Sequence, residues 1–117
     1  PVGADAAGQM YNINADIAAR EVAVALKAAR LVYLSDVPGI LRDPKDESSL
    51  IPSISEADIA RLKAEGVLSG GMLPKVDSAL SALRRGVGKV QFIDGRVPHS
   101  LLLELFTDSG IGTEIVL

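Results

Sequence analysis

The sequence contains no cysteine and no tryptophan, and aromatic residues make up only 3% of its 117 positions. Without cysteine the chain has no disulfides and no thiolate metal sites, which fits a cytoplasmic protein. The single histidine, His99, has no cysteine or second histidine near it and is a poor metal ligand or triad member. Because 48% of the residues are nevertheless hydrophobic, the core must be aliphatic. A core of Val, Ile, Leu and Ala is typical of parallel sheets that are covered by helices.

Long apolar runs and a strong charge of one sign are also absent. The net charge is −3, and acidic and basic residues are interspersed, which argues against a nucleic-acid partner. No hydrophobic run reaches membrane-spanning length and no signal-peptide pattern is present, so we expect no membrane partner. The length suits one domain over residues 1–117. Because the sequence begins with Pro1 rather than methionine, we expect it to be a fragment of a longer protein.

Helix and strand signals alternate along the chain and predict an α/β fold. Residues 31–35 are a short apolar run after a helix, and we expect them to form a central strand. Residues 36–39 break this strand at its C-terminal end, the edge where open α/β sheets bind ligands. The order of elements predicts helices around a mostly parallel sheet. The expected strands are 9–13, 31–35, 50–54, 89–93 and 112–116, the expected helices are 15–29, 55–65, 72–85 and 98–106, and residues 1–8 are expected to form a turn.

One lysine occupies an unfavourable place in the predicted pattern. In residues 69–75 (SGGMLPK) two glycines open a helix, and Lys75 follows within its first turns. A cation there faces the positive end of the helix dipole, which costs about a few tenths of a kcal/mol. A bound anion would reverse this, because the backbone amides, the dipole and the ammonium would all face negative charge. The plain alternative is a solvated surface lysine.

Other motifs have structural interpretations beside functional ones. In residues 11–16 (YNINAD), Asn14 caps a helix and Asp16 complements its dipole. Residues 35–40 (SDVPGI) are either an ordinary turn or part of a nucleotide site, although the chain lacks the P-loop and dinucleotide fingerprints. An apolar stripe on the last helix is predicted to be core or a subunit contact; it consists of Leu101, Leu102, Leu105 and Phe106.

Taken together, five motifs resemble the amino-acid kinase superfamily and, within it, the N-acetylglutamate kinases of arginine biosynthesis. The resemblance covers essentially all 117 residues in the expected order and spacing. Residues 35–40 are shared across that superfamily, whereas the combination of the motifs at 11–16, 69–75 and 93–99 is specific. The five motifs are 11–16 (YNINAD), 35–40 (SDVPGI), 69–75 (SGGMLPK), 93–99 (IDGRVPH) and 103–113 (LELFTDSGIGT).

The resemblance implies a three-layer αβα sandwich and an ATP-dependent transferase of arginine biosynthesis. Members pass the γ-phosphoryl group of ATP to the side-chain carboxylate of N-acetyl-L-glutamate. This chain would be the C-terminal, nucleotide-binding part, and the acetylglutamate-binding half would lie outside it. Mg²⁺ would arrive with ATP, held mainly by phosphates and water, so no protein metal ligand is expected. The full-length protein would be a homo-oligomer.

The resemblance also assigns roles to particular residues. Lys75 would be one of two lysines that stabilise the transferring phosphoryl group, and Asp16 would hold the catalytic lysines in place. Asn12 would contact acetylglutamate. The nucleotide would be bound by two loops, made of Asp36, Val37, Pro38, Gly39, Ile40 and Leu41 and of Val67, Leu68 and Ser69.

The C-terminal motifs resemble the hexameric members that L-arginine inhibits. His99 and Glu104 would then be contacts for arginine as an allosteric effector. An alternative interpretation is the arginine-sensing, kinase-like domain of an acetylglutamate synthase, against which the presence of both Asp16 and Lys75 argues. A structural fragment without a ligand is a third interpretation, and aspartate or glutamate 5-kinases fit the motifs poorly.

Overall fold

Helices and strands alternate along the chain largely where the sequence predicts them. The computed structural model describes residues 1–108 and 110–117. Ser109, within the motif 103–113, lies outside the described residues. The elements are β1 (Val2–Ala4), β2 (Met10–Asn12), α1 (Ala15–Ala25), β3 (Leu31–Ser35), the 3₁₀ turn η1 (Glu47–Ser49), β4 (Ser53–Ser55), α2 (Glu56–Ala64), α3 (Met72–Arg84), β5 (Val90–Asp94), α4 (Ser100–Phe106) and β6 (Thr113–Val116).

The main sheet has the strand order β3-β5-β6-β4. Strand β3 pairs parallel with β5, β4 pairs parallel with β6, and β5 and β6 are antiparallel. The expectation of a mostly parallel sheet is therefore confirmed. The expectation that 31–35 is the central strand is wrong, because β3 lies at one edge of the sheet. All five residues of β5 are buried, whereas Leu34 in β3 is exposed.

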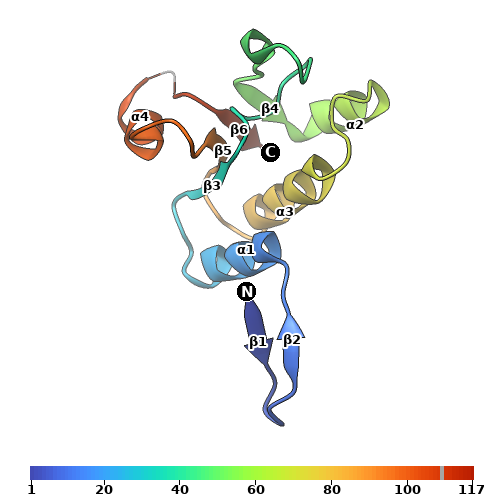
Figure 1. Ribbon diagram of the computed structural model, residues 1–117, viewed down its shortest axis with the longest axis vertical. Coiled ribbons are helices and arrows are strands. Elements are labelled where there is room, and N and C mark those ends of the chain that lie inside the picture. The colour runs from blue at the N-terminus through green and yellow to red at the C-terminus, as the bar shows by residue number, and fades with distance from the viewer. Residues whose placement is uncertain (109) are drawn as a thin grey trace.

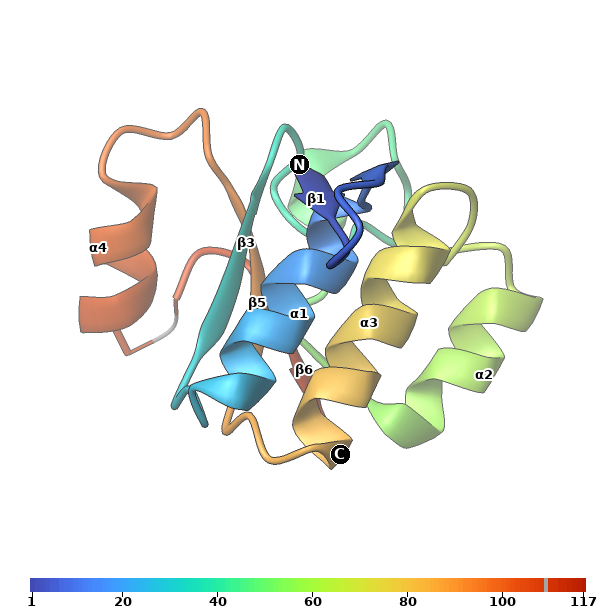
Figure 2. The same cartoon turned by 90° about the horizontal axis from the view of Figure 1, so that it is seen from below.

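Helices cover both faces of this sheet and form the predicted three-layer sandwich. Figure 2 shows α1, α3 and α2 side by side on one face, with α4 on the other. The apolar side of α3 packs toward the strands, and its residues Val76, Ala79 and Ala82 are fully buried. They meet Phe92 of β5 and Ile115 of β6 in one hydrophobic cluster. The core is mainly aliphatic, as the scarcity of aromatic residues predicts, and Tyr33 and Phe92 are its aromatic members.

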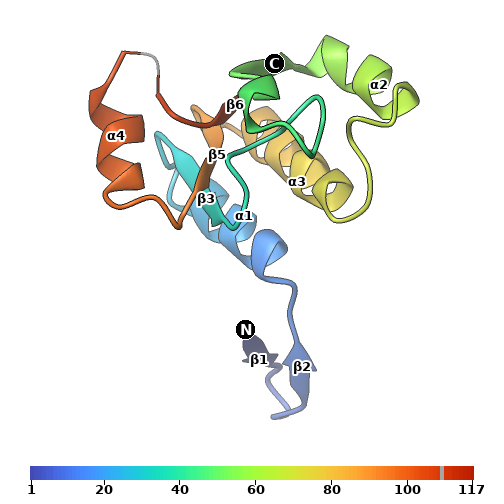
Figure 3. The same ribbon diagram turned by 45° about the horizontal axis from the view of Figure 1, so that its top comes forward.

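A two-stranded hairpin projects from the body of the chain at its N-terminal end (Figures 1 and 3). The expectation of a turn over 1–8 is incomplete, because Val2–Ala4 forms β1 and pairs antiparallel with β2. Asp5 holds the turn between the strands by accepting hydrogen bonds from the backbone N–H of Ala7 and Gln9. Its carboxylate also accepts one from the Tyr11 hydroxyl at 3.0 Å.

Helix α1 begins where the sequence predicts and ends earlier. The Asn14 side chain accepts a hydrogen bond from the N–H of Ile17 at 3.1 Å, which confirms the predicted cap. The helix ends at Ala25 rather than 29, because Lys27 adopts a left-handed conformation with φ +49°. The N–H of Ala28 then bonds to the carbonyl of Ala23, a closure usually made with glycine. Ile17 in its first turn is 46% exposed.

Helix α4 turns its polar residues inward. It begins at Ser100 instead of Pro98, and its buried residues are Ser100 and Glu104. Of the two predictions for the apolar stripe, a subunit contact stays a prediction, and a place in the core is wrong, since Leu102 is 54% and Phe106 80% exposed. The reason is that the Glu104 carboxylate is needed inside, where it binds backbone N–H groups of the loop after the helix.

Candidate active site

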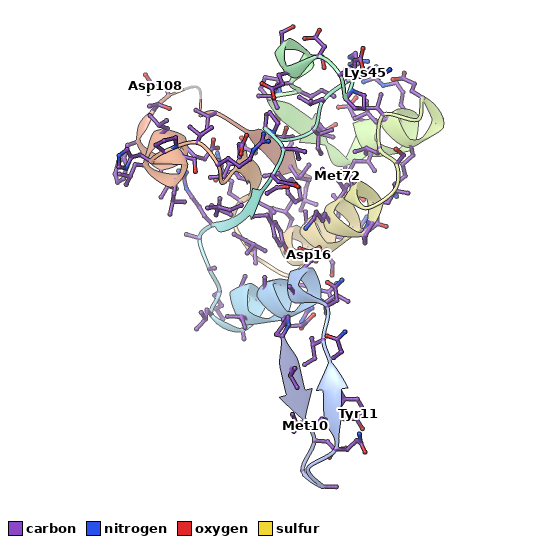
Figure 4. All side chains as sticks on the ribbon, viewed as in Figure 1. Met10, Tyr11, Asp16, Lys45, Met72 and Asp108 are labelled. Atoms are coloured by element: carbon purple, nitrogen blue, oxygen red, sulfur yellow. The ribbon has the colours of Figure 1, made fainter. Side chains whose placement is uncertain are left out.

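The N-terminal ends of two helices lie next to each other at the C-terminal ends of strands β3 and β5. Figure 2 shows α1 and α3 running side by side in the same direction, and both begin there. Figure 4 labels Asp16 at the start of α1 and Met72 at the start of α3, on these neighbouring helix ends. The positive ends of two helix dipoles therefore lie close together.

A lysine and an aspartate join these two helix starts. The Lys75 Nζ of α3 lies 2.8 Å and 2.9 Å from the two carboxylate oxygens of Asp16 in α1. The side chain of Lys75 is 31% exposed and that of Asp16 20%, so the pair is half-buried and reachable from solvent. The structure thus brings together the two residues predicted to be catalytic, which are 59 positions apart in the sequence. Asp16 also supplies the negative charge that the first turn of α3 lacks.

The start of α3 has the features of an anion site. Within the described part of the chain, no side chain caps this helix, whose N-cap is Gly71. Gly70 has a φ of +53°, which favours glycine, and a Cβ atom at either glycine would meet open space. The N–H groups of Met72 and Leu73 bond to the backbone carbonyls of Ser69 and Gly70 at 3.2 and 3.3 Å. The positive end of the helix dipole and the Lys75 ammonium both favour negative charge here.

Beside this helix start lies an apolar pocket of about 180 Å³. It is built from the loop after β3, the segment before α3 and the first residue of α3. It brings together six of the nine residues predicted to bind nucleotide. Of the other three, Leu68 is buried in the core, Asp36 is exposed, and Pro38 does not line the pocket. The lining residues are Val37, Gly39, Ile40, Leu41, Pro44, Val67, Ser69 and Met72.

The loop after β3 is held by a residue that the sequence did not single out. The Thr113 hydroxyl in β6 accepts a hydrogen bond from the N–H of Ile40 at 2.9 Å and donates one to the carbonyl of Ile51 at 2.7 Å. Gly39 leaves room for it: at φ +152°, a Cβ atom there would lie 2.7 Å from the Thr113 hydroxyl. A buried threonine in a predicted strand has no signal that marks such a role.

The motif 93–99 ends β5 at the same edge with an ion pair. The Asp94 carboxylate accepts hydrogen bonds from the backbone N–H and the guanidinium of Arg96. These bonds lower the pKa of Asp94 below its ordinary value. The pair fixes the turn that leads from β5 to α4.

A second, polar pocket of about 140 Å³ lies beneath α4. Arg30 and Lys89, which directly precede β3 and β5, line it at the N-terminal ends of these strands, whereas the apolar pocket follows the C-terminal end of β3. Glu104 lines it too, with its carboxylate bound to the N–H groups of Ile111 (2.7 Å) and Gly112 (3.1 Å) and to the Gln91 amide. The remaining lining residues are Pro52, Gln91, Leu105, Thr107, Asp108, Gly110, Gly112 and Glu114.

Gln91 is the unexpected member of this polar pocket. It is only 4% exposed, and its Oε1 has no hydrogen-bond partner among the described atoms. An unsatisfied buried acceptor is costly unless a donor from a ligand or water reaches it. No sequence pattern distinguishes this glutamine from other residues of a buried strand.

Two predicted site residues stand apart from these pockets. Asn12 is exposed on the hairpin strand β2, a few residues before Asp16. His99 is exposed at the start of α4, with φ +61°, and does not line the polar pocket with Glu104. Residues 1–108 and 110–117 contain no group of three or more His, Cys, Asp or Glu side chains that could hold a metal. None of the described helices is both long and apolar enough to cross a membrane.

Comparison with known proteins identifies the family. Residues 1–94 match the Amino acid kinase family. Acetylglutamate kinase from Heliobacterium modesticaldum is 60% identical over 99% of this chain, and that from Carboxydothermus hydrogenoformans is 58% identical over 97%. The chain spans 39% and 38% of the length of these relatives.

A solved structure shares the fold as well as much of the sequence. N-acetylglutamate synthase from Neisseria gonorrhoeae, complexed with coenzyme A and L-arginine, matches with a TM-score of 0.82 and 36% identity. The match covers 98% of this chain and 26% of the synthase. The family match, the two kinases and the shared fold agree with one another. The chain belongs to the amino acid kinase family.

Proposed function

We propose that this chain is the ATP-binding part of an acetylglutamate kinase, which transfers the γ-phosphoryl group of ATP to the side-chain carboxylate of N-acetyl-L-glutamate. The observation that carries the proposal is the Lys75–Asp16 pair at the uncapped start of α3, next to an apolar pocket. The identity of 58–60% to acetylglutamate kinases supports the same substrate.

The two parts of the site suit the two ends of ATP. A pocket of about 180 Å³ is smaller than the roughly 300–1,000 Å³ of sites for whole drug-sized ligands, so it suits the adenine base. The phosphates would then extend toward the start of α3. The Lys75 ammonium would balance the charge that develops on the transferring group, and Asp16 would orient it. Phosphoryl transfer needs positioned charge more than covalent chemistry by the protein.

Mg²⁺ would accompany ATP and neutralise phosphate charge when bound. Its ligands would be mainly the phosphates and water. Asn12, exposed on the hairpin near the start of α1, would contact acetylglutamate. Much of that substrate's pocket and a second lysine would belong to the remainder of the full-length enzyme, a homo-oligomer of the cytoplasm. The isolated chain would then bind nucleotide weakly and lack turnover.

An acetylglutamate synthase is the alternative that the solved structure raises. The synthase from Neisseria gonorrhoeae is 36% identical to this chain, well below the values for the kinases. A purely sensory domain would also have no need of the Lys75–Asp16 pair. The kinase is therefore the better supported proposal.

The test is ADP release by the full-length protein with ATP, Mg²⁺ and N-acetyl-L-glutamate. A kinase releases ADP only when acetylglutamate is present. A parallel assay with glutamate and acetyl-coenzyme A tests the alternative. Acetyl transfer without ADP release would overturn the proposal in favour of the synthase.

We further propose that the polar pocket beneath α4 binds L-arginine as an inhibitor. Its charges suit an amino acid with a cationic side chain, since Arg30 can meet a carboxylate and Asp108 can meet a cation, beside the ion pair that Lys89 and Glu114 form at 2.7 Å. The unpartnered Gln91 Oε1 can accept a further hydrogen bond from the ligand. Glu104 would shape the pocket, while His99, outside its lining, would make an outer contact.

Arginine inhibition of the full-length kinase tests this second site. We expect Gln91→Leu to weaken inhibition about tenfold, because it removes the unsatisfied acceptor without removing a charge. Turnover without arginine should stay within about twofold, because the pocket lies at the opposite edge of the sheet from Lys75. Wild-type activity that arginine leaves unchanged would contradict the proposal.

A further inference from the structure

Tyr33, in the middle of β3, contacts both members of the Lys75–Asp16 pair. The Lys75 Nζ lies 5.8 Å from the centroid of the Tyr33 ring. The Tyr33 hydroxyl donates a hydrogen bond to the backbone carbonyl of Asp16 at 3.1 Å. One side chain from the sheet thus reaches the start of α1 and the charged group of α3 together.

A second hydroxyl converges on the same carbonyl. Ser78, one turn after Lys75 on α3, donates to the carbonyl of Asp16 at 3.3 Å. The hydroxyls of Ser78 and Tyr33 lie 3.4 Å apart. Because these groups come from β3, α1 and α3, the three elements are tied at one point directly below the ion pair.

Tyr33 is itself held rigidly. Its side chain is 8% exposed, and its ring stacks on Phe92 of β5 with centroids 5.2 Å apart and planes 14° apart. The Tyr33 hydroxyl is a hydrogen-bond donor at neutral pH, and burial raises its pKa further above its ordinary value. Packing alone would be satisfied by a phenylalanine, so the hydroxyl does more than fill the core.

We propose that Tyr33 is a positioning residue for phosphoryl transfer, which fixes Asp16 through its hydroxyl and holds the Lys75 ammonium over its ring. The inference rests on the proposed function of that pair. A ring face attracts an ammonium group without neutralising it. Lys75 would therefore be held in place while its charge remains available to the phosphoryl group.

The test compares Tyr33→Phe and Tyr33→Leu in the full-length protein. Tyr33→Phe removes only the hydroxyl and should lower kcat about fivefold, with KM for ATP within about twofold. Tyr33→Leu also removes the ring and should lower kcat about three- to fivefold more. As a control, Ile115→Val loses a buried methyl group on β6 and should cost stability without lowering kcat.

A double-mutant cycle with Asp16→Asn separates positioning from support of the fold. If Tyr33 acts through the pair, Tyr33→Phe should cost no further activity when Asp16 is already replaced. An equal loss in both backgrounds, or unchanged kcat in Tyr33→Phe alone, would overturn the inference and leave the kinase proposal intact. If Asp16→Asn itself matches the wild type, the proposed role of the pair fails, and the inference fails with it.

Discussion

At the scale of the residue, single hydroxyl groups hold the loops around the candidate site. Thr113 has none of its surface exposed, yet its hydroxyl serves the N–H of Ile40 and the carbonyl of Ile51 at once. Ile40 belongs to the apolar pocket, so this contact sets one of its walls. Buried backbone groups that lose such a partner are costly.

Replacing Thr113 by valine should therefore weaken both the fold and the pocket. Valine keeps the shape but leaves the N–H of Ile40 and the carbonyl of Ile51 unpaired, so we expect a loss of about 1–3 kcal/mol in the free energy of unfolding. ATP should also bind more weakly. Denaturant unfolding and a nucleotide titration measure the two effects.

Thr107→Val is the matched control, because that hydroxyl donates to the carbonyl of Leu103 on the exposed surface. Its cost should stay within about 0.5 kcal/mol. Equal losses in the two variants would contradict the role given to Thr113.

At the scale of the element, an ion pair on the helix surface joins α1 to α3. Arg85 at the end of α3 forms two hydrogen bonds with Glu21 of α1, at 2.7 and 2.9 Å. Arg20 donates a third at 2.9 Å. The bonds from Arg85 first, and then those from Arg20, lower the pKa of Glu21 to about 2. The two helices that carry Asp16 and Lys75 are thereby linked a second time.

The pH dependence of stability should report this link. Because the folded pKa of Glu21 lies below its ordinary value of 4.5, the stabilisation is complete above pH 4.5 and is lost as the pH falls toward 2. Glu21→Gln cannot ionise, so it should lower stability at neutral pH and flatten the loss between about pH 5 and pH 2. Thermal unfolding across this range measures the slope.

Glu65→Gln provides the comparison, since the Glu65 carboxylate has a looser contact, 3.6 Å from Arg42. Its pH profile should follow that of the wild type. The link would be disproved by a Glu21→Gln profile that also parallels the wild type.

The elements that local chemistry determines could be predicted from the sequence. Helix starts with a side-chain cap lie where expected, as at Asn14 and at Ser55, which accepts a hydrogen bond from the N–H of Asp58. Strand order could not be predicted, because β3 reaches the edge of the sheet through pairings with distant segments. In α4 the polar Glu104 faces inward while leucines face solvent, because Glu104 contacts the loop at 111–112. The sequence pattern of a seven-residue helix does not show that contact.

The residues of the candidate site likewise divide into those that could be predicted from the sequence and those that could not. The resemblance to a family singled out Lys75 and Asp16, whose contact spans 59 positions, and the loops that line the apolar pocket. Gln91 and Tyr33 were missed, and Thr113 entered only as the last residue of the motif 103–113, without a role of its own. Their roles arise from contacts between elements rather than from local spacing.

At the scale of the whole molecule, two pockets lie at opposite ends of the strands of one sheet. The apolar pocket and the Lys75–Asp16 pair lie where β3 ends and α1 and α3 begin, and the polar pocket lies beneath α4. The kinases it resembles are longer, and this chain spans 38–39% of their length. The hairpin projects from the body with Val2, Met10 and Tyr11 exposed.

The central claim is that Lys75 supplies charge to the transferring phosphoryl group, and the kcat of Lys75→Ala in the full-length protein tests it most directly. Loss of one such group costs about 100- to 1,000-fold in rate, so kcat for acetylglutamate-dependent ADP release should fall by that factor. Lys63→Ala, which removes an exposed lysine paired with Asp77 at 3.0 Å, should keep the wild-type rate. A Lys75→Ala variant that is folded and turns over like Lys63→Ala would contradict the account.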